Sequence, residues 1–140
     1  MPSTILSRRN FLRVLALIGV TPKGSVAAQT NPAVPTASIT ILFSILVKEG
    51  KEQEAADIMR RLTDSTRAED DGALSYVFLQ QQNNPREYVL YEQWRDSAAL
   101  NAHLARLRKV FGPAREGGSI PATILDLFET SRAVRYRVVG

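Results

Sequence analysis

The chain has 140 residues, contains no cysteine and is 44% hydrophobic, which indicates one domain with a modest core. The lack of cysteine excludes thiol catalysis and disulfide bonds. The net charge of +4 does not indicate a nucleic-acid partner, because four basic residues lie before residue 28 and no acidic residue does. The rest of the chain has 14 basic and 14 acidic residues.

The first 28 residues have the features of an export signal. Residues 7–13, SRRNFLR, resemble the twin-arginine export motif, and the apolar run 14–20 that follows is far shorter than the ~20 residues that span a bilayer. Small residues allow cleavage after Ala27 or Ala28. We therefore expect residues 1–28 to be a twin-arginine signal peptide that delivers the protein, through the twin-arginine machinery, to the periplasm or the exterior. The alternative is a basic amphipathic N-terminal helix of a cytosolic protein.

The remaining chain predicts a linker, four strands and two helices. Pro32 and Pro35 mark residues 29–37 as a linker. The apolar run 38–48 predicts a strand buried on both faces, and the spacing of apolar residues over 51–67 predicts an amphipathic helix. Further along, the pattern predicts a turn at 70–72, a hairpin of strands 73–81 and 87–94, a helix at 97–110, and one or two strands within 124–139.

This β-α-β-β-α-β order is that of the ferredoxin-like α+β fold, with a four-stranded antiparallel sheet and both helices on one face. The other face of the sheet also carries apolar side chains, and no helix is left to cover it. A large uncovered apolar face predicts a partner surface. We therefore expect a homodimer that packs sheet against sheet, with the long last strand reaching toward the other subunit.

The only histidine and the only tryptophan of the chain are predicted to share one wall of a pocket. In helix 97–110, His103 lies in an apolar stripe with Leu100 and Leu107, and Asp96 is the expected N-cap. In strand 87–94, alternation places Tyr88, Leu90, Glu92 and Trp94 on one face. The structural alternative is that His103 and Trp94 are simply core residues.

Residues 91–104, YEQWRDSAALNAHL, resemble the strand-to-helix signature of the antibiotic biosynthesis monooxygenase family, and the resemblance in element order extends over about residues 38–130. The family forms dimeric α+β barrels, so residues 38–140 are expected to be such a domain. Some members oxidise quinols or polyketide aromatics with O₂ and without metal or flavin, some relatives degrade haem, and many have no known activity. The resemblance thus implies an oxygenase that acts on a small aromatic or quinol without a cofactor.

Under this reading each candidate residue has a role. His103 would transfer the proton, and Glu92 would orient His103 or bind a substrate hydroxyl. Trp94 would hold the substrate ring. The remaining substrate-binding candidates are the aromatic residues Phe43, Tyr76, Phe78 and Phe111, and the hydrogen-bond donor Arg108.

Other chemistries have less support in the sequence. No histidines are paired at ligand spacing, so no protein metal site is expected. Haem-degrading relatives use an asparagine on the first strand, and residues 38–48 contain none. Two alternatives stay open: a non-catalytic dimer that binds a small hydrophobic ligand or haem, and a fold retained for assembly, with its cavity filled by side chains.

Overall fold

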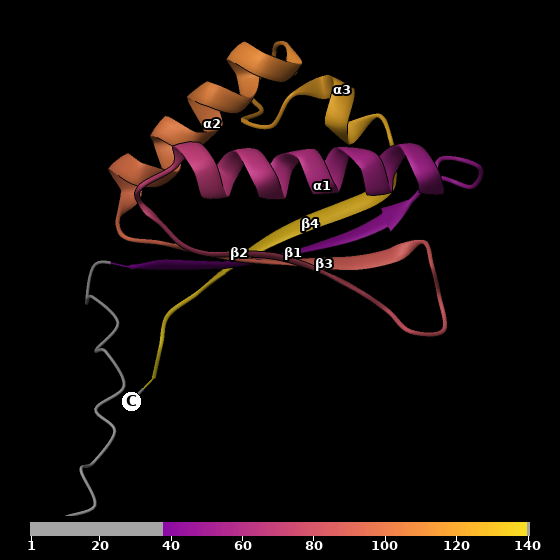
Figure 1. Ribbon diagram of the computed structural model, residues 1–140, viewed down its shortest axis with the longest axis horizontal. Coiled ribbons are helices and arrows are strands. Elements are labelled where there is room, and N and C mark those ends of the chain that lie inside the picture. The colour runs from indigo at the N-terminus through magenta and orange to yellow at the C-terminus, as the bar shows by residue number, and fades with distance from the viewer. Residues whose placement is uncertain (1–37, 140) are drawn as a thin grey trace, which may run out of the picture. The chain divides into compact units, whose positions relative to one another are not determined.

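The computed structural model describes residues 38–139, so the predicted signal peptide and linker lie outside the described residues. The elements are β1 (Ile39–Val47), α1 (Glu52–Glu69), β2 (Ala73–Gln80), β3 (Glu87–Trp94), α2 (Ser97–Phe111), α3 (Ala122–Leu125) and β4 (Phe128–Tyr136). Figure 1 shows α1 and α2 lying on the same side of the sheet.

The four strands form one antiparallel sheet in the order β2-β3-β1-β4. The predicted ferredoxin-like α+β fold is therefore confirmed. The central strand β1 pairs Phe43 with Leu90 of β3 on one side and with Ala133 of β4 on the other. Because neighbouring side chains in register point to the same face, this row of residues faces the helices.

Two details of the strand predictions were wrong. Residues 124–139 do not begin as a strand, because the amides of Ile124 and Leu125 both bond to the carbonyl of Pro121 and close one helical turn, α3. The first strand is not buried on both faces within this chain: Ile41, Phe43 and Ile45 are buried, whereas the side chains between them are exposed or half-buried.

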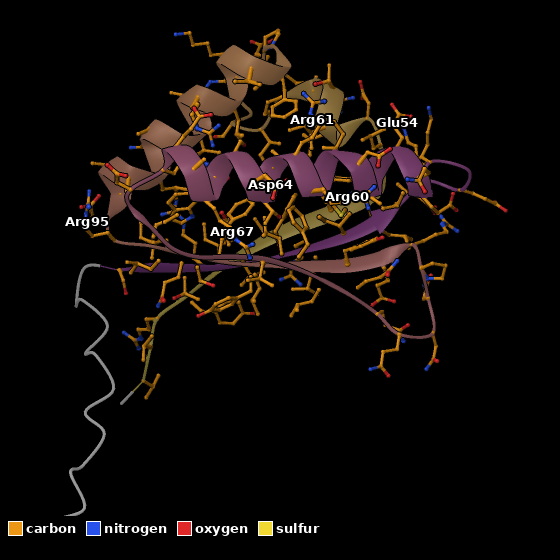
Figure 2. All side chains as sticks on the ribbon, in the orientation of Figure 1. Glu54, Arg60, Arg61, Asp64, Arg67 and Arg95 are labelled. Carbon is orange, nitrogen blue, oxygen red and sulfur yellow. The ribbon has the colours of Figure 1, made fainter. Side chains whose placement is uncertain are left out.

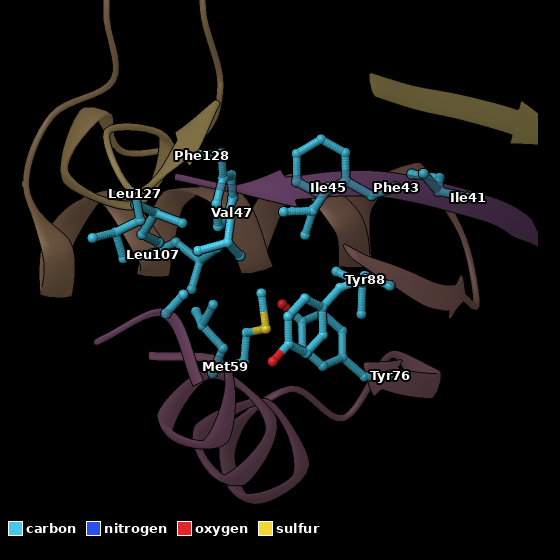
Figure 3. Packing of buried hydrophobic residues seen from close by; sticks show 14 of the residues in the cluster. Ile41, Phe43, Ile45, Val47, Met59, Tyr76, Tyr88, Leu107, Leu127 and Phe128 are labelled. Atoms are coloured by element: carbon cyan, nitrogen blue, oxygen red, sulfur yellow. The ribbon is translucent and has the colours of Figure 1, made fainter. Parts of the chain in front are cut away.

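The core fills the space between the sheet and the helices. Met59 of α1 and Leu107 of α2 point toward the helix-facing residues of the sheet, among them Phe43 and Ile45 (Figure 3). The charged residues of α1 that Figure 2 labels, Glu54, Arg60, Arg61, Asp64 and Arg67, are all exposed. The 3.6-residue period of α1 thus separates an apolar stripe from a solvated one, as the sequence predicts.

Helix α2 is held in place at its first turn. The Asp96 carboxylate accepts a hydrogen bond from the backbone amide of Ala99 at 2.8 Å, which confirms the predicted N-cap. The turn before β2 passes close to the same point, since the Gly72 carbonyl accepts from the Arg95 amide at 2.9 Å. A Cβ atom on Gly72 would lie 2.2 Å from the Cβ of Ala99.

We predict that Gly72→Ala lowers the free energy of unfolding, measured in urea, by at least the ~1–3 kcal/mol typical of overpacking. The added methyl would force α2 away from the turn. Ala99→Gly in the same chain should restore part of the loss, because it removes the atom that the new methyl meets. By itself Ala99→Gly should cost about 1 kcal/mol. A Gly72→Ala variant as stable as the wild type would contradict this packing.

Candidate active site

His103 is almost completely buried, at 2% exposure, at the centre of an aromatic cluster. Its ring lies against Trp94 with the centroids 4.5 Å apart and the planes inclined by 38°. Tyr76 of β2 lies on another side, with the ring centroids 5.4 Å apart. The predicted proximity of the histidine and the tryptophan is therefore present, and three different elements hold the imidazole.

A carboxylate from the turn between α1 and β2 completes the surroundings of His103. Asp70 Oδ2 lies 2.7 Å from His103 Nδ1, and the Asp70 side chain is only 8% exposed. Arg106, on the same helix as His103, donates to both oxygens of Asp70, from Nε at 3.1 Å and from Nη2 at 2.5 Å. Asp70 therefore joins His103 to a fixed guanidinium.

The ionisation states of Asp70, Arg106 and His103 follow from their mutual hydrogen bonds. Burial opposes ionisation of Asp70, but the hydrogen bonds from Arg106 and His103 outweigh it and hold the pKa of the carboxyl below its ordinary value. The hydrogen bond to Asp70 in turn raises the pKa of Arg106. An ionised Asp70 can only accept, so Nδ1 of His103 must carry the proton and donate it.

Burial has the larger effect on His103 and lowers the pKa of the imidazole, although Asp70 opposes the shift. The ring is therefore neutral at pH 7, with its proton on Nδ1. Its other nitrogen, Nε2, is then an acceptor. Among the hydrogen bonds of residues 38–139 none involves Nε2, so this is the atom left to take a proton from a ligand.

Glu92 makes no hydrogen bond to His103, so the first of its two predicted roles is not seen in the structure, and the second, binding of a substrate hydroxyl, stays a prediction. Its carboxylate accepts a hydrogen bond from the indole nitrogen of Trp94 at 2.9 Å. The two residues stand on the same face of β3 at positions i and i+2, which brings their side chains together. Burial raises the pKa of Glu92, and the bond from Trp94 offsets only part of that effect.

A partly open cavity of about 50 Å³ lies between the sheet and α2, beside His103. Five of the predicted residues line it: His103, Glu92, Tyr76, Phe43 and Phe78. The rest of its wall is aliphatic or aromatic, and comprises Ile45, Leu62, Leu90, Leu104, Leu107, Ile120, Ile124 and Phe128. Phe78, Leu104 and Ile120 are the half-buried members of the wall, so we take the mouth of the cavity to lie beside them.

Three predicted substrate-binding residues do not reach the cavity. Trp94 is fully buried behind His103 and packs in the core. Phe111 lies near the end of α2 under the guanidinium of Arg61, 5.1 Å from its ring centroid. Arg108 is half-buried and donates to the backbone carbonyl of Ser119 at 3.0 Å. The apolar stripe of α2 extends beyond the cavity, so its spacing alone could not show that Phe111 lies outside the cavity.

Sequence reasoning missed Asp70 and Arg106. Asp70 was interpreted only as a turn residue, and it lies 33 positions before its partner His103. The one sequence feature that could have indicated Asp70 as a site residue is its position just before β2, a strand that borders the predicted pocket. Arg106 follows His103 by three positions, so the two share a helical face, but a lone arginine there is ordinarily solvated.

Two negative findings apply to the described part of the chain. Residues 38–139 contain no group of three or more histidine, cysteine, aspartate or glutamate side chains placed to hold a metal ion. Within the same range, no helix combines the length and the apolar character that crossing a membrane requires.

Comparison with known proteins agrees with this architecture. Residues 38–107, half of the chain, match the antibiotic biosynthesis monooxygenase family model. No curated protein matches the chain in sequence. The chain belongs to the antibiotic biosynthesis monooxygenase family, as the motif at residues 91–104 predicts.

Solved structures share its fold at low sequence identity. PA3566 from Pseudomonas aeruginosa is 22% identical with a TM-score of 0.60, and the match covers 78% of this chain and all of that one. SnoaB from Streptomyces nogalater, a cofactor-independent oxygenase whose crystallised form is a variant, is 17% identical with a TM-score of 0.59, covering 74% and 95% of the two chains. A conserved protein from Methanosarcina mazei is 20% identical with a TM-score of 0.57, covering 73% and 93%. These likenesses show the fold alone.

The burial of His103 predicts a specific dependence of stability on pH. The folded protein binds the imidazole proton at a lower pH than the unfolded chain, whose reference pKa is 6.5. The stability that neutral His103 contributes is therefore present above that pH and is lost as the pH falls below it. In urea unfolding between pH 7 and pH 5, we expect the wild type to lose more stability than His103→Gln.

Glu92 is the control for this measurement, because its raised pKa acts in the opposite sense. Its contribution is present below its reference pKa of 4.5 and is lost as the pH rises above that value. Glu92→Gln should therefore leave the His103-dependent difference in place and make the acid destabilisation steeper. Parallel curves for the wild type and His103→Gln would contradict a depressed histidine pKa.

Proposed function

We propose that this protein is an exported, cofactor-independent monooxygenase that oxidises a small aromatic or quinol with O₂. The observation that carries the proposal is the buried Asp70–His103 pair, with a neutral imidazole that opens on an apolar cavity. Membership of the antibiotic biosynthesis monooxygenase family supports the reaction class. Fold and family do not establish an activity by themselves, so the chemistry of these residues has to support the reaction.

Oxygenation without a cofactor begins with removal of a proton from an electron-rich ring. His103 Nε2 would accept the proton of a phenolic hydroxyl, and the ionised Asp70 would stabilise the imidazolium that forms. Arg106 keeps Asp70 ionised and in position. The resulting phenolate is a better electron donor than the phenol and can transfer an electron to O₂ within the apolar walls, which keep bulk water from the intermediate.

A dihydroxylated ring supplies all the electrons that the reaction needs. One oxygen atom of O₂ forms a new bond to a ring carbon, and the other leaves as water after the peroxidic O–O bond breaks. The ring gives up four electrons in total and ends as a hydroxylated quinone. No external reductant is required, and the proton taken up by His103 goes to the departing water.

The ring would lie at the mouth of the cavity. Pockets for drug-sized ligands measure ~300–1,000 Å³, whereas this cavity measures about 50 Å³. A ring placed against Phe78, Leu104 and Ile120 can direct its hydroxyl inward to His103. The same small volume argues against the alternative in which the cavity holds haem.

We also propose that the protein is a homodimer. On the sheet face without helices, Leu79 and Tyr136 are 56% and 50% exposed, and Leu42, Leu46 and Tyr91 are half-buried. Within residues 38–139 no element covers this face (Figure 1). A second copy placed sheet against sheet would bury these side chains.

The export proposal rests on the twin-arginine-like motif at residues 7–13.

We predict that the mature protein consumes oxygen in the presence of quinols or polyphenols, with or without chelator, and that His103→Gln and Asp70→Asn lower turnover by ~10²–10⁴-fold. Both variants weaken the same proton acceptor. Asp126→Asn is the matched control, because it removes an exposed carboxylate that is also paired with an arginine, Arg115. Oxygen uptake that is lost with chelator, or that persists in His103→Gln, would contradict the proposal.

For the dimer, we predict that Leu79→Glu raises the dissociation constant at least tenfold, because it places a charge in the buried interface. The measurement is light scattering with size exclusion at micromolar concentration. Val110→Glu is the matched control, since Val110 on α2 is also 56% exposed but lies on the helical side. A wild-type protein that is only monomeric under these conditions would remove the dimer proposal.

A further inference from the structure

The small cavity beside His103 is itself the best candidate for the dioxygen site. We propose that it binds one molecule the size of O₂, while the aromatic substrate stays at the mouth. This inference rests on the proposed function for its catalytic meaning, but binding of the gas can be tested without any turnover.

The volume is the first argument. A cavity needs ~10–15 Å³ of accessible volume to hold one water molecule, and an engineered apolar cavity of ~150 Å³ is known to take benzene. At about 50 Å³, this cavity has room for a diatomic molecule and not for a six-membered ring. The well-packed core around it would have to move to admit anything larger.

The chemistry of the wall is the second argument. Most of the lining consists of aliphatic and aromatic side chains, including Ile45, Leu107 and Phe128. A buried water requires about two to four hydrogen-bond partners. Among the polar lining residues, His103 uses Nδ1 on Asp70 and Glu92 uses Oε2 on Trp94, which leaves Nε2 of His103 and the other oxygen of Glu92 as the acceptors of the wall. The Tyr76 hydroxyl lies beside the Thr66 side chain of α1. Most of the wall offers nothing for water to bond to and suits a small apolar guest.

The position of the cavity is the third argument. Its lining includes Ile45, Ile124 and the edge-to-face ring pair Phe43–Phe128, and also the two titratable residues His103 and Glu92. A gas molecule held there would adjoin the imidazole that takes the proton from the substrate. A ring at the mouth, against Phe78 and Leu104, would then lie in contact with it.

The first test uses O₂ directly. We would record methyl NMR spectra of the mature protein under pressure of O₂ and, as the diamagnetic control, of N₂. The paramagnetic gas should broaden the methyl signals of the lining residues Ile45, Leu62, Leu107 and Ile124 several-fold more than those of Val47, Leu100 and Leu127. The latter three are as deeply buried but do not line the cavity. Equal broadening in the two groups would overturn the proposal.

The second test measures kinetics with matched variants. Ile45→Phe fills the cavity, whereas Ile41→Phe makes the same change on the same face of β1 at a position that does not line it. We expect Ile45→Phe to raise the KM for O₂ at least fivefold while the KM for the quinol stays the same, and Ile41→Phe to change neither constant. An unchanged KM for O₂ in a folded Ile45→Phe protein would contradict the assignment.

The two tests separate this inference from the proposed function. If the wild type consumes no oxygen with any quinol, the monooxygenase proposal fails, and selective broadening of the cavity methyls would still support a site for a small apolar gas. If oxygen is consumed but the broadening is uniform, the monooxygenase proposal stands and the dioxygen site is rejected. Should Ile45→Phe not fold, the NMR comparison on the wild type decides.

Discussion

The buried contact between Asp70 and His103 is the constraint on which the rest of the site depends. Burial of the Asp70 carboxylate costs desolvation free energy, and Arg106 offsets this cost with two hydrogen bonds. The ionised Asp70 then determines which imidazole nitrogen carries the proton. In turn, the close approach of Gly72 to Ala99 keeps the turn that carries Asp70 against the helix that carries His103. The fold thus positions the neutral imidazole before any ligand arrives.

The carboxyl of Glu92 is also buried, but its pKa is shifted in the opposite direction to that of Asp70. Glu92 is bonded by the neutral Trp94 indole, and burial raises its pKa, whereas Asp70 is held ionised by a guanidinium. Two carboxyls near one imidazole are therefore driven apart in pKa by their surroundings, a pattern that occurs where acid and base roles are divided. Trp94 lies between His103 and Glu92, since its ring packs at a tilt against the imidazole and its indole nitrogen donates to Glu92.

Much of this architecture could be predicted from local sequence patterns. Apolar periodicity identified both long helices and the four strands, and the motif at residues 91–104 placed Trp94 and His103 together. What failed depends on contacts between distant segments. Asp70 looks like any turn residue until the fold brings it across 33 positions to His103. Likewise, the apolar stripe of α2 could not reveal that Phe111 lies beyond the cavity, because cavity boundaries are set by several elements at once.

The central claim is that burial keeps His103 neutral while Asp70 fixes the proton on Nδ1, and the most direct measurement is ¹⁵N NMR of the imidazole. His103 is the only histidine in the chain, so in a protein without a histidine tag its signals need no assignment. The account predicts the neutral Nδ1–H tautomer at pH 7, a pKa below 6.5, and loss of the tautomer preference in Asp70→Asn. An imidazole that is charged at pH 7, or protonated on Nε2, would contradict it.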